Sequence, residues 1–187
     1  MKYFEHESAA TFDEAVSLLK ESPKGKTVVM AGGSDLIGVL KEQILEDYPE
    51  KVVDLKTVRG GEYIKQDGDT IEIGALTKLC DIVKSDLLNE KAPVLSQAAR
   101  SVATPLIRNV ATMGGNICQD VRCWFYRYPH GIGGRMDCMR KGGKECYAVM
   151  GDNRYHSIFG GMKVHTTPCS VQCPANTDIP AYMERLR

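Results

Sequence analysis

Cysteines are the residues of this chain with the clearest chemistry, and six of the seven follow residue 117. Four of them form a C-x4-C-x14-C-x7-C pattern, made by Cys118, Cys123, Cys138 and Cys146. This spacing matches neither the paired C-x2-C of a zinc knuckle nor the compact cysteine run of a ferredoxin. It predicts four thiolates in one loop-rich stretch. We interpret them as an iron–sulfur site, and a zinc site or buried free cysteines are the alternatives.

Two glycine pairs could bring the backbone close to a ligand, because glycine has no Cβ and tolerates positive φ. Gly32-Gly33 follows a short apolar run and precedes a helical pattern, an order that leaves amides pointing outward and suits a phosphate. An isolated pair of this kind is more often only a tight turn, and neither pair forms a GxGxxG fingerprint. The second pair, Gly114-Gly115, follows Arg108, which is either a phosphate anchor or a solvated side chain.

Short elements must position these loops. Thr11 and Glu14 form a capping box, in which the Glu14 amide donates to the Thr11 hydroxyl and the Thr11 amide donates to the Glu14 carboxylate. Asp67-Gly68 is a hairpin turn signal. Hydrophobic periodicity predicts strands at 3–5, 27–31 and 52–55, helices at 12–20 and 35–41, a hairpin of 63–65 with 70–75, a helix capped by Thr77, and a helix over 92–102.

Composition excludes several functional classes. The chain of 187 residues can form one or two cores, and its net charge is zero with the signs well mixed, which argues against binding to nucleic acid or to a membrane surface. No apolar run approaches a bilayer span, and the first residues lack the apolar stretch of a signal peptide. We therefore expect a cytoplasmic protein, whose clustered cysteines serve metals rather than disulfides.

Three ordered motifs carry a resemblance to a known family. AGGSDL at 31–36, IGALT at 73–77 and VLSQAARSVATPLIRNVATMGGN at 94–116 resemble the flavin-binding domain of the molybdenum hydroxylases, over roughly residues 1–117. These enzymes include the xanthine dehydrogenases, the CO dehydrogenase medium subunits and the 4-hydroxybenzoyl-CoA reductases. The resemblance implies an α+β, p-cresol methylhydroxylase-type fold, with FAD between a first subdomain at 1–57 and a second that begins at 58–117.

The same resemblance assigns cofactor-binding residues. It places Ala31, Gly32, Gly33, Ser34, Asp35 and Leu36 around the FAD pyrophosphate, and Thr112, Gly114, Gly115 and Asn116 at the flavin side, with Arg108 as a further candidate. Successive amides at such a glycine turn form an anion-binding nest.

Residues 118–164 resemble an iron–sulfur insert carried by the flavin subunits of 4-hydroxybenzoyl-CoA reductases. The resemblance implies a [4Fe–4S] cluster held by Cys123, Cys138 and Cys146, with Cys118 as the fourth ligand. This chain departs from the pattern at Met162, where relatives tend to carry another cysteine. The histidines at 130, 156 and 165 are interpreted as hydrogen-bonding loop residues rather than ligands.

Residues 165–187 resemble the iron–sulfur N-terminus of the glutamate synthase small subunit, through Cys169, Cys173 and the Pro174–Pro180 run. Two cysteines do not complete a cluster.

The expected function is electron transfer in a molybdenum-hydroxylase-type oxidoreductase. The resemblance implies a molybdopterin subunit and a [2Fe–2S] subunit as partners, and NAD(P)H or ferredoxin as the electron exchanger. No general acid–base set is visible, so the cofactors would carry the chemistry. The alternative is a non-enzymatic iron–sulfur or zinc module with a vestigial flavin fold.

Overall fold

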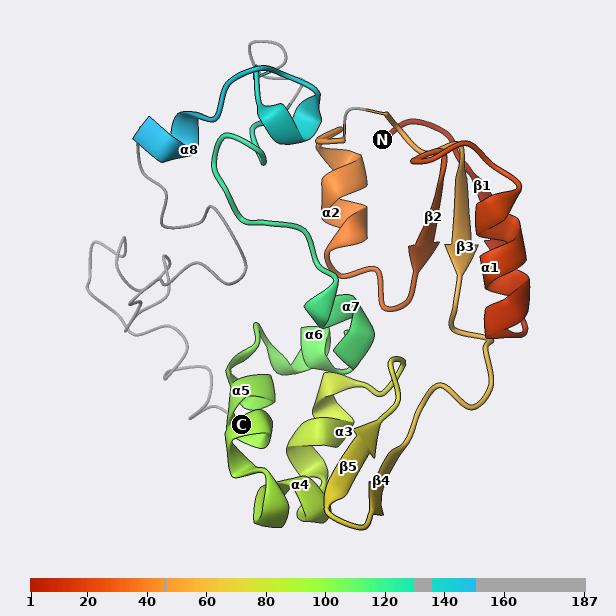
Figure 1. Ribbon diagram of the computed structural model, residues 1–187, viewed down its shortest axis with the longest axis vertical. Coiled ribbons are helices and arrows are strands. Elements are labelled where there is room, and N and C mark those ends of the chain that lie inside the picture. The colour runs from red at the N-terminus through yellow and green to blue at the C-terminus, as the bar shows by residue number, and fades with distance from the viewer. Residues whose placement is uncertain (46, 130–135, 151–187) are drawn as a thin grey trace.

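The computed structural model of the protein describes residues 1–45, 47–129 and 136–150. Its first half, at the top of Figure 1, contains a parallel three-stranded sheet with helices on both sides. The strand order is β1-β3-β2, and the registers place Glu5 and Thr27 beside Lys51. The elements of this half are β1 (Glu5–Ser8), α1 (Phe12–Lys20), β2 (Thr27–Met30), α2 (Leu36–Lys41) and β3 (Lys51–Asp54).

The second half, at the bottom of Figure 1, packs an antiparallel hairpin against short helices, with α6 and α7 lying between the two halves. Its elements are β4 (Ile64–Asp67), β5 (Thr70–Ile73), α3 (Leu79–Lys84), α4 (Asp86–Lys91), α5 (Pro93–Ser101), α6 (Pro105–Arg108) and α7 (Met113–Ile117). After α7 the chain turns back along α2 to a 3-10 helix η1 (Met139–Lys141) and α8 (Tyr147–Met150).

Three apolar clusters form the core, and each one joins distant parts of the sequence. Between α1 and the sheet lie Ala9, Ala15, Val53, Val58 and Leu76. The second half is built around Leu79, Ile82, Val83, Leu88, Ala99 and Ala111. The third cluster contains Val39, Ile44, Val121, Cys123, Tyr126, Cys138 and Ala148, so the cysteine-bearing residues pack against α2 and the turn that follows it.

Local sequence signals predicted most of these elements. The helix at 12–20 is confirmed, and the other predicted helices, inner strands and hairpin agree to within a few residues. The first strand was predicted at 3–5 but begins at Glu5 and runs to Ser8, because its pairing with β3 fixes its extent. The short helices α4, α6 and α7 were not predicted from the sequence.

Two capping predictions need correction. The Glu14 amide does donate to the Thr11 hydroxyl at 3.1 Å, but the Glu14 carboxylate accepts from the Ala10 amide rather than from the Thr11 amide. Thr77 does not cap α3, which begins after Lys78. Its hydroxyl instead bonds both the amide and the carbonyl of Tyr63 at 3.0 Å, and so ties the hairpin to the start of α3.

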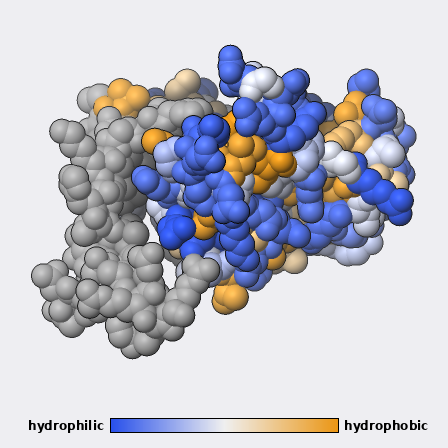
Figure 2. Space-filling model, turned by 90° about the horizontal axis from the view of Figure 1, so that it is seen from below, coloured by the Kyte–Doolittle hydropathy of each residue, from blue (hydrophilic) through white to orange (hydrophobic). Residues whose placement is uncertain are grey.

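Seen from the end of the second half, the surface is mainly hydrophilic, with an apolar area near its middle and smaller ones toward its edges (Figure 2). Among the described residues, no helix has the length and apolar character needed to cross a membrane. The predictions for the histidines at 130, 156 and 165, for Met162, and for Cys169 and Cys173 in the tail lie outside the described residues.

Candidate functional site

The first glycine loop, residues 31–36, lies directly against the segment that leads into the second. A methyl group at Gly32 would lie 2.0 Å from the carbonyl oxygen of Val110 and 3.1 Å from the Cα of Ala111. Both are backbone atoms, so no side-chain rotation could relieve the clash. Gly32 therefore allows two loops about eighty residues apart in sequence to touch.

The second glycine loop is seated on the third motif, residues 73–77. The Gly114 amide donates to the Ala75 carbonyl and the Met113 amide to the Thr77 carbonyl, both at 2.8 Å. Thr112 caps α7 by accepting from the Gly115 amide, and a methyl group at Gly114 would crowd Ala75. The three motifs of the sequence therefore meet in one place, at the carboxyl end of β2 and between the two halves of the chain.

Backbone amides are available at the first loop. Gly33 adopts a positive φ of 70°, and the amides of residues 32–36 donate to no acceptor among the described residues. Consecutive amides of this kind at the end of a β-strand bind anions, since each carries a partial positive charge. The geometry suits a phosphate ester of a nucleotide.

The Asp35 carboxylate faces away from that loop and toward the chain that follows α7. It accepts from the Arg127 guanidinium at 3.0 and 3.2 Å and from the Asp120 amide at 2.8 Å, and it pairs with Arg122 at 2.8 Å. An unpaired carboxylate beside an anion-binding loop would repel a phosphate. Two arginines offset that charge here, so the loop keeps a favourable potential for an anion.

The Arg108 side chain is held by contacts within the protein. Its side chain is buried, and its Nη1 donates to the carbonyls of Val102 and Ala103 at 2.8 and 3.2 Å. Ala103 has a positive φ of 44°, a conformation that costs energy for any residue with a Cβ. The guanidinium holds this turn in place after α5, so Arg108 is not the solvated side chain that was one of its two predicted roles.

Three of the four predicted cysteine ligands line one small cavity. Cys123, Cys138 and Cys146 surround a space of about 30 Å³ together with Tyr126 and Arg140. Cys118 is exposed at the end of α7 and is not part of this lining. The structure thus brings together three of the four thiols that the sequence pattern singled out.

A single metal ion and a cluster make different demands on those thiols. Tetrahedral zinc needs thiolates roughly 3.8 Å apart, and the described residues contain no group of three ligands placed to hold one ion. An iron–sulfur cubane lies between its thiolates and keeps them farther apart. The donor set fits a cluster in kind, but the cavity would have to widen to take one.

Tyr126 connects this cavity to the charged groups above it. Its phenol donates a short hydrogen bond to the Asp120 carboxylate. Burial raises the pKa of the phenol most, and the hydrogen bond to Asp120 raises it further. The Arg140 guanidinium and the Lys141 ammonium lie 5.4 and 5.8 Å from the ring centroid. Such cations would offset the negative charge of nearby thiolates.

Sequence reasoning did not assign roles to Asp120, Arg122, Tyr126 or Arg127. The concentration of charged and aromatic residues in the stretch after Gln119 is the signal that could have drawn attention to them. Their partners could not be read from it, because Asp35 lies more than eighty positions earlier.

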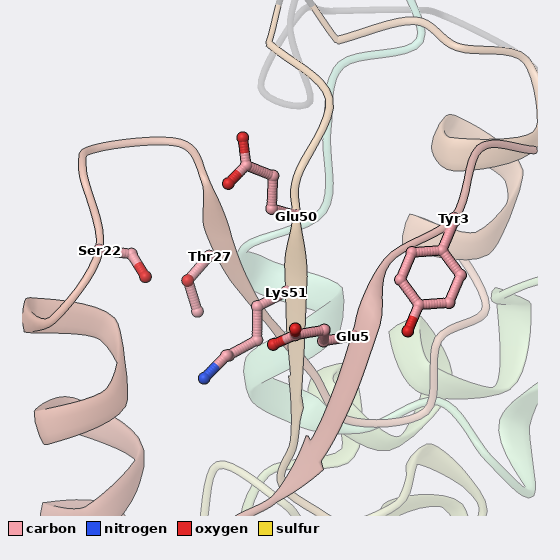
Figure 3. Close-up of a pocket in the computed structure, with 6 residues that line it drawn as sticks. All are labelled: Tyr3, Glu5, Ser22, Thr27, Glu50 and Lys51. Atoms are coloured by element: carbon pink, nitrogen blue, oxygen red, sulfur yellow. The ribbon is translucent and has the colours of Figure 1, made fainter.

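A second cavity, of about 310 Å³, lies at the opposite end of the parallel sheet (Figure 3). Glu5, Lys51 and Thr27 occupy one row across the strands there, and Lys51 pairs with Glu7 at 2.8 Å. The Thr27 hydroxyl has no hydrogen-bond partner among the described residues, but it is fully buried and beyond the reach of a ligand. We assign this cavity no function.

A small parallel sheet with an open-amide glycine loop, joined to a second α+β half, defines a nucleotide-cofactor-binding domain. The family described as "FAD binding domain in molybdopterin dehydrogenase" matches residues 2–130. The chain belongs to this family, as its α+β fold and its three convergent motifs lead one to expect.

Individual relatives agree with that assignment. The chain is 34% identical over 117 residues to the nicotinate dehydrogenase FAD-subunit of Eubacterium barkeri, which covers 63% of this chain and 39% of that protein. Its fold matches carbon monoxide dehydrogenase from Hydrogenophaga pseudoflava with a TM-score of 0.59 and 31% identity, over 62% of this chain and 39% of that one. The chain thus spans about two fifths of the length of these relatives.

One further relative extends past the family match. The aldehyde oxidoreductase FAD-binding subunit of Escherichia coli is 29% identical over 161 residues, 86% of this chain and 48% of that protein. Any continuous stretch of 161 residues in a chain of 187 includes positions 27–161. This similarity therefore takes in the cysteine-bearing residues as well as the flavin domain.

Proposed function

We propose that this chain is the flavin- and [4Fe–4S]-binding, electron-transferring part of a multi-subunit oxidoreductase of the molybdenum hydroxylase type. The observation that carries the proposal is the convergence of three motifs on one loop with open amides. FAD would supply the two-electron and one-electron redox chemistry. The chain's own residues would bind and orient it and would keep the local charge favourable.

The binding roles follow from the contacts. The amides of residues 32–36 would hold the pyrophosphate, and the loop at 112–116 would approach the flavin side. Ser34 is exposed beside those amides and can add a hydroxyl donor. Asn116 would offer its side-chain amide there, and Gly115, whose own amide donates to the Thr112 hydroxyl, would leave room for the flavin because it has no Cβ.

The iron–sulfur part of the proposal depends on the donor set. Cys123, Cys138 and Cys146 line one cavity, and Arg140 lies at its wall. We keep Cys118 as the fourth ligand, which requires the end of α7 and the cavity lining to approach one another. A cluster here would lie on the far side of α2 from the sheet, within the same compact half as the FAD loop.

Partners and exchangers are part of the same proposal. The names of the relatives are those of FAD subunits and medium chains of dehydrogenases, which implies further subunits. We propose a molybdopterin subunit and a [2Fe–2S] subunit as partners in the cytoplasm, with NAD(P)H or ferredoxin exchanging electrons. The 165–187 segment resembles the iron–sulfur N-terminus of the glutamate synthase small subunit, but its two cysteines would not complete a cluster by themselves.

One observation favours a second reading. Cys123 and Cys138 are buried in an apolar cluster, where cysteines also serve as ordinary core residues. In that case the chain would be a structural or assembly module with a vestigial flavin fold, with or without zinc.

An anaerobic absorption spectrum, with iron, sulfide and released-flavin assays on the same sample, separates the two readings. Stoichiometric FAD and about four irons per chain support electron transfer, since one cubane requires that number. Cys123→Ser should then lose iron, and Cys80→Ser, a change of the same kind in α3, should keep it. A colourless protein that contains zinc or no metal would contradict the proposal.

A further inference from the structure

We infer that Asp35 is a positioning residue that makes flavin binding at the first glycine loop depend on the cysteine segment, defined as residues 118–129 and 136–150. The inference rests on the proposed function for the identity of its ligands. It concerns a contact within the chain, between the Asp35 carboxylate and the cysteine segment.

The orientation of Asp35 is the first observation. It occupies the N-cap position of α2, where an aspartate usually accepts a hydrogen bond from the first turn of its own helix. Its side chain makes no such bond. Its side-chain contacts with the described residues go to the cysteine segment, through Arg122, Arg127 and the Asp120 amide. The carboxylate is 21% exposed, so water screens these contacts only in part.

A continuous set of hydrogen bonds leads from that carboxylate to the cavity between the cysteines. Arg127 also donates to the carbonyls of Val121 and Asp120, at 2.6 and 3.0 Å. The Asp120 carboxylate accepts from the Tyr126 phenol, whose ring lines the cavity. One end of this set is Asp35, whose own backbone amide is one of the open amides at 32–36.

Apolar packing makes the same connection. Val39 of α2 shares one core cluster with Val121, Cys123 and Tyr126. The loop at 31–36 is the start of α2, so a shift of the cysteine segment moves the helix and with it the amides that would hold a phosphate. Packed elements of this kind adopt discrete arrangements rather than deforming smoothly.

Thermodynamic linkage means that the inference can be tested in two ways, through the affinity for FAD and through the conformation of the cysteine segment. If the conformation of the cysteine segment changes the affinity for FAD by some factor, FAD must change the conformational equilibrium of that segment by the same factor. Asp35 is the polar group through which both effects pass. Replacing it should therefore weaken FAD binding and also remove the influence of FAD on the cysteines.

The first test measures FAD dissociation constants by flavin fluorescence on the full 187-residue chain. Asp35→Asn and Arg127→Gln should each weaken binding about tenfold, and the double variant should lose clearly less than the product of the two factors, because both changes break the Asp35–Arg127 contact. Arg127→Lys should recover part of the loss. Glu7→Gln removes a 2.8 Å ion pair to Lys51 at the far end of the sheet and should leave the affinity unchanged.

The second test measures alkylation rates of Cys123 and Cys138 by iodoacetamide in the iron-depleted chain, read by mass spectrometry. FAD should slow both reactions severalfold in the wild type and not in Asp35→Asn, and Cys80 should react equally in all cases. A general loss of stability would speed every thiol with or without FAD, so it would not produce this pattern.

The outcomes separate the two proposals. A wild-type chain that binds no FAD overturns the proposed function and this inference with it. A wild type that binds FAD while both single variants bind equally well overturns the inference alone, and so do additive losses or equal protection of the thiols in Asp35→Asn.

Discussion

Replacing Gly32 by alanine tests the contact on which the whole site depends. The new Cβ would lie 2.0 Å from the Val110 carbonyl oxygen, and ordinary contacts begin at 3.4 Å, so the two loops must separate by about 1.4 Å. Both sides of the contact are backbone. Overpacking of this kind typically costs 1–3 kcal/mol, and we expect the upper end, about 3 kcal/mol. In a chain of this size that lowers the melting temperature by roughly 6–12 °C.

The same change should weaken FAD binding, because the displaced loop carries the amides at 32–36. We expect a loss of at least about tenfold, which corresponds to roughly 1.4 kcal/mol. Urea unfolding followed by circular dichroism gives the stability, and flavin fluorescence gives the affinity.

Gly38→Ala is the matched control for this experiment. Gly38 lies within α2, six residues further along the chain, and an added Cβ there would meet no atom within 4 Å. Alanine is the better helix former, so this variant should be more stable by roughly 0.5–1 kcal/mol and should bind FAD normally. If Gly32→Ala and Gly38→Ala have the same stability and the same affinity for FAD, the two glycine loops do not touch and the reasoning is wrong.

Three further predictions concern single buried groups. Arg108→Met leaves two backbone carbonyls at the end of α5 without their donor. The free energy of unfolding, measured in urea, should fall by about 2–3 kcal/mol. Unchanged stability with weaker FAD binding would instead make Arg108 a phosphate anchor. The raised pKa of Tyr126 stabilises the fold while the phenol is neutral, so this contribution is complete below the ordinary value of 10.0 and declines as the pH rises above it. In Tyr126→Phe the unfolding free energy should therefore fall less steeply above pH 10 than in the wild type, and parallel pH profiles would contradict the burial of that phenol beside Asp120. Thr77→Val removes both hydrogen bonds to the backbone of Tyr63. The stability measured by thermal unfolding should fall by about 1–3 kcal/mol. Unchanged stability would mean that the hairpin is held by its apolar contacts alone.

The sequence by itself determined the elements whose signals are local. The helix at 12–20 follows from its cap and its apolar spacing, and the hairpin around Asp67-Gly68 follows from a turn that few other residues permit. The two glycine pairs marked close approach of the backbone correctly, because only glycine lacks the atom that would prevent it. The four cysteines marked one segment, and three of them line one cavity.

Tertiary structure alone decided what these local features touch. Gly32 meets Val110, and Asp35 turns from the helix that it begins toward Arg127, across separations of about eighty and ninety residues. No local pattern encodes a partner at that distance, since the local sequence around a charged residue is the same whether its side chain faces water or an arginine. Arg108 illustrates the same limit, because its buried guanidinium donates to the carbonyls of a turn in which Ala103 has a positive φ, a conformation that the sequence does not signal.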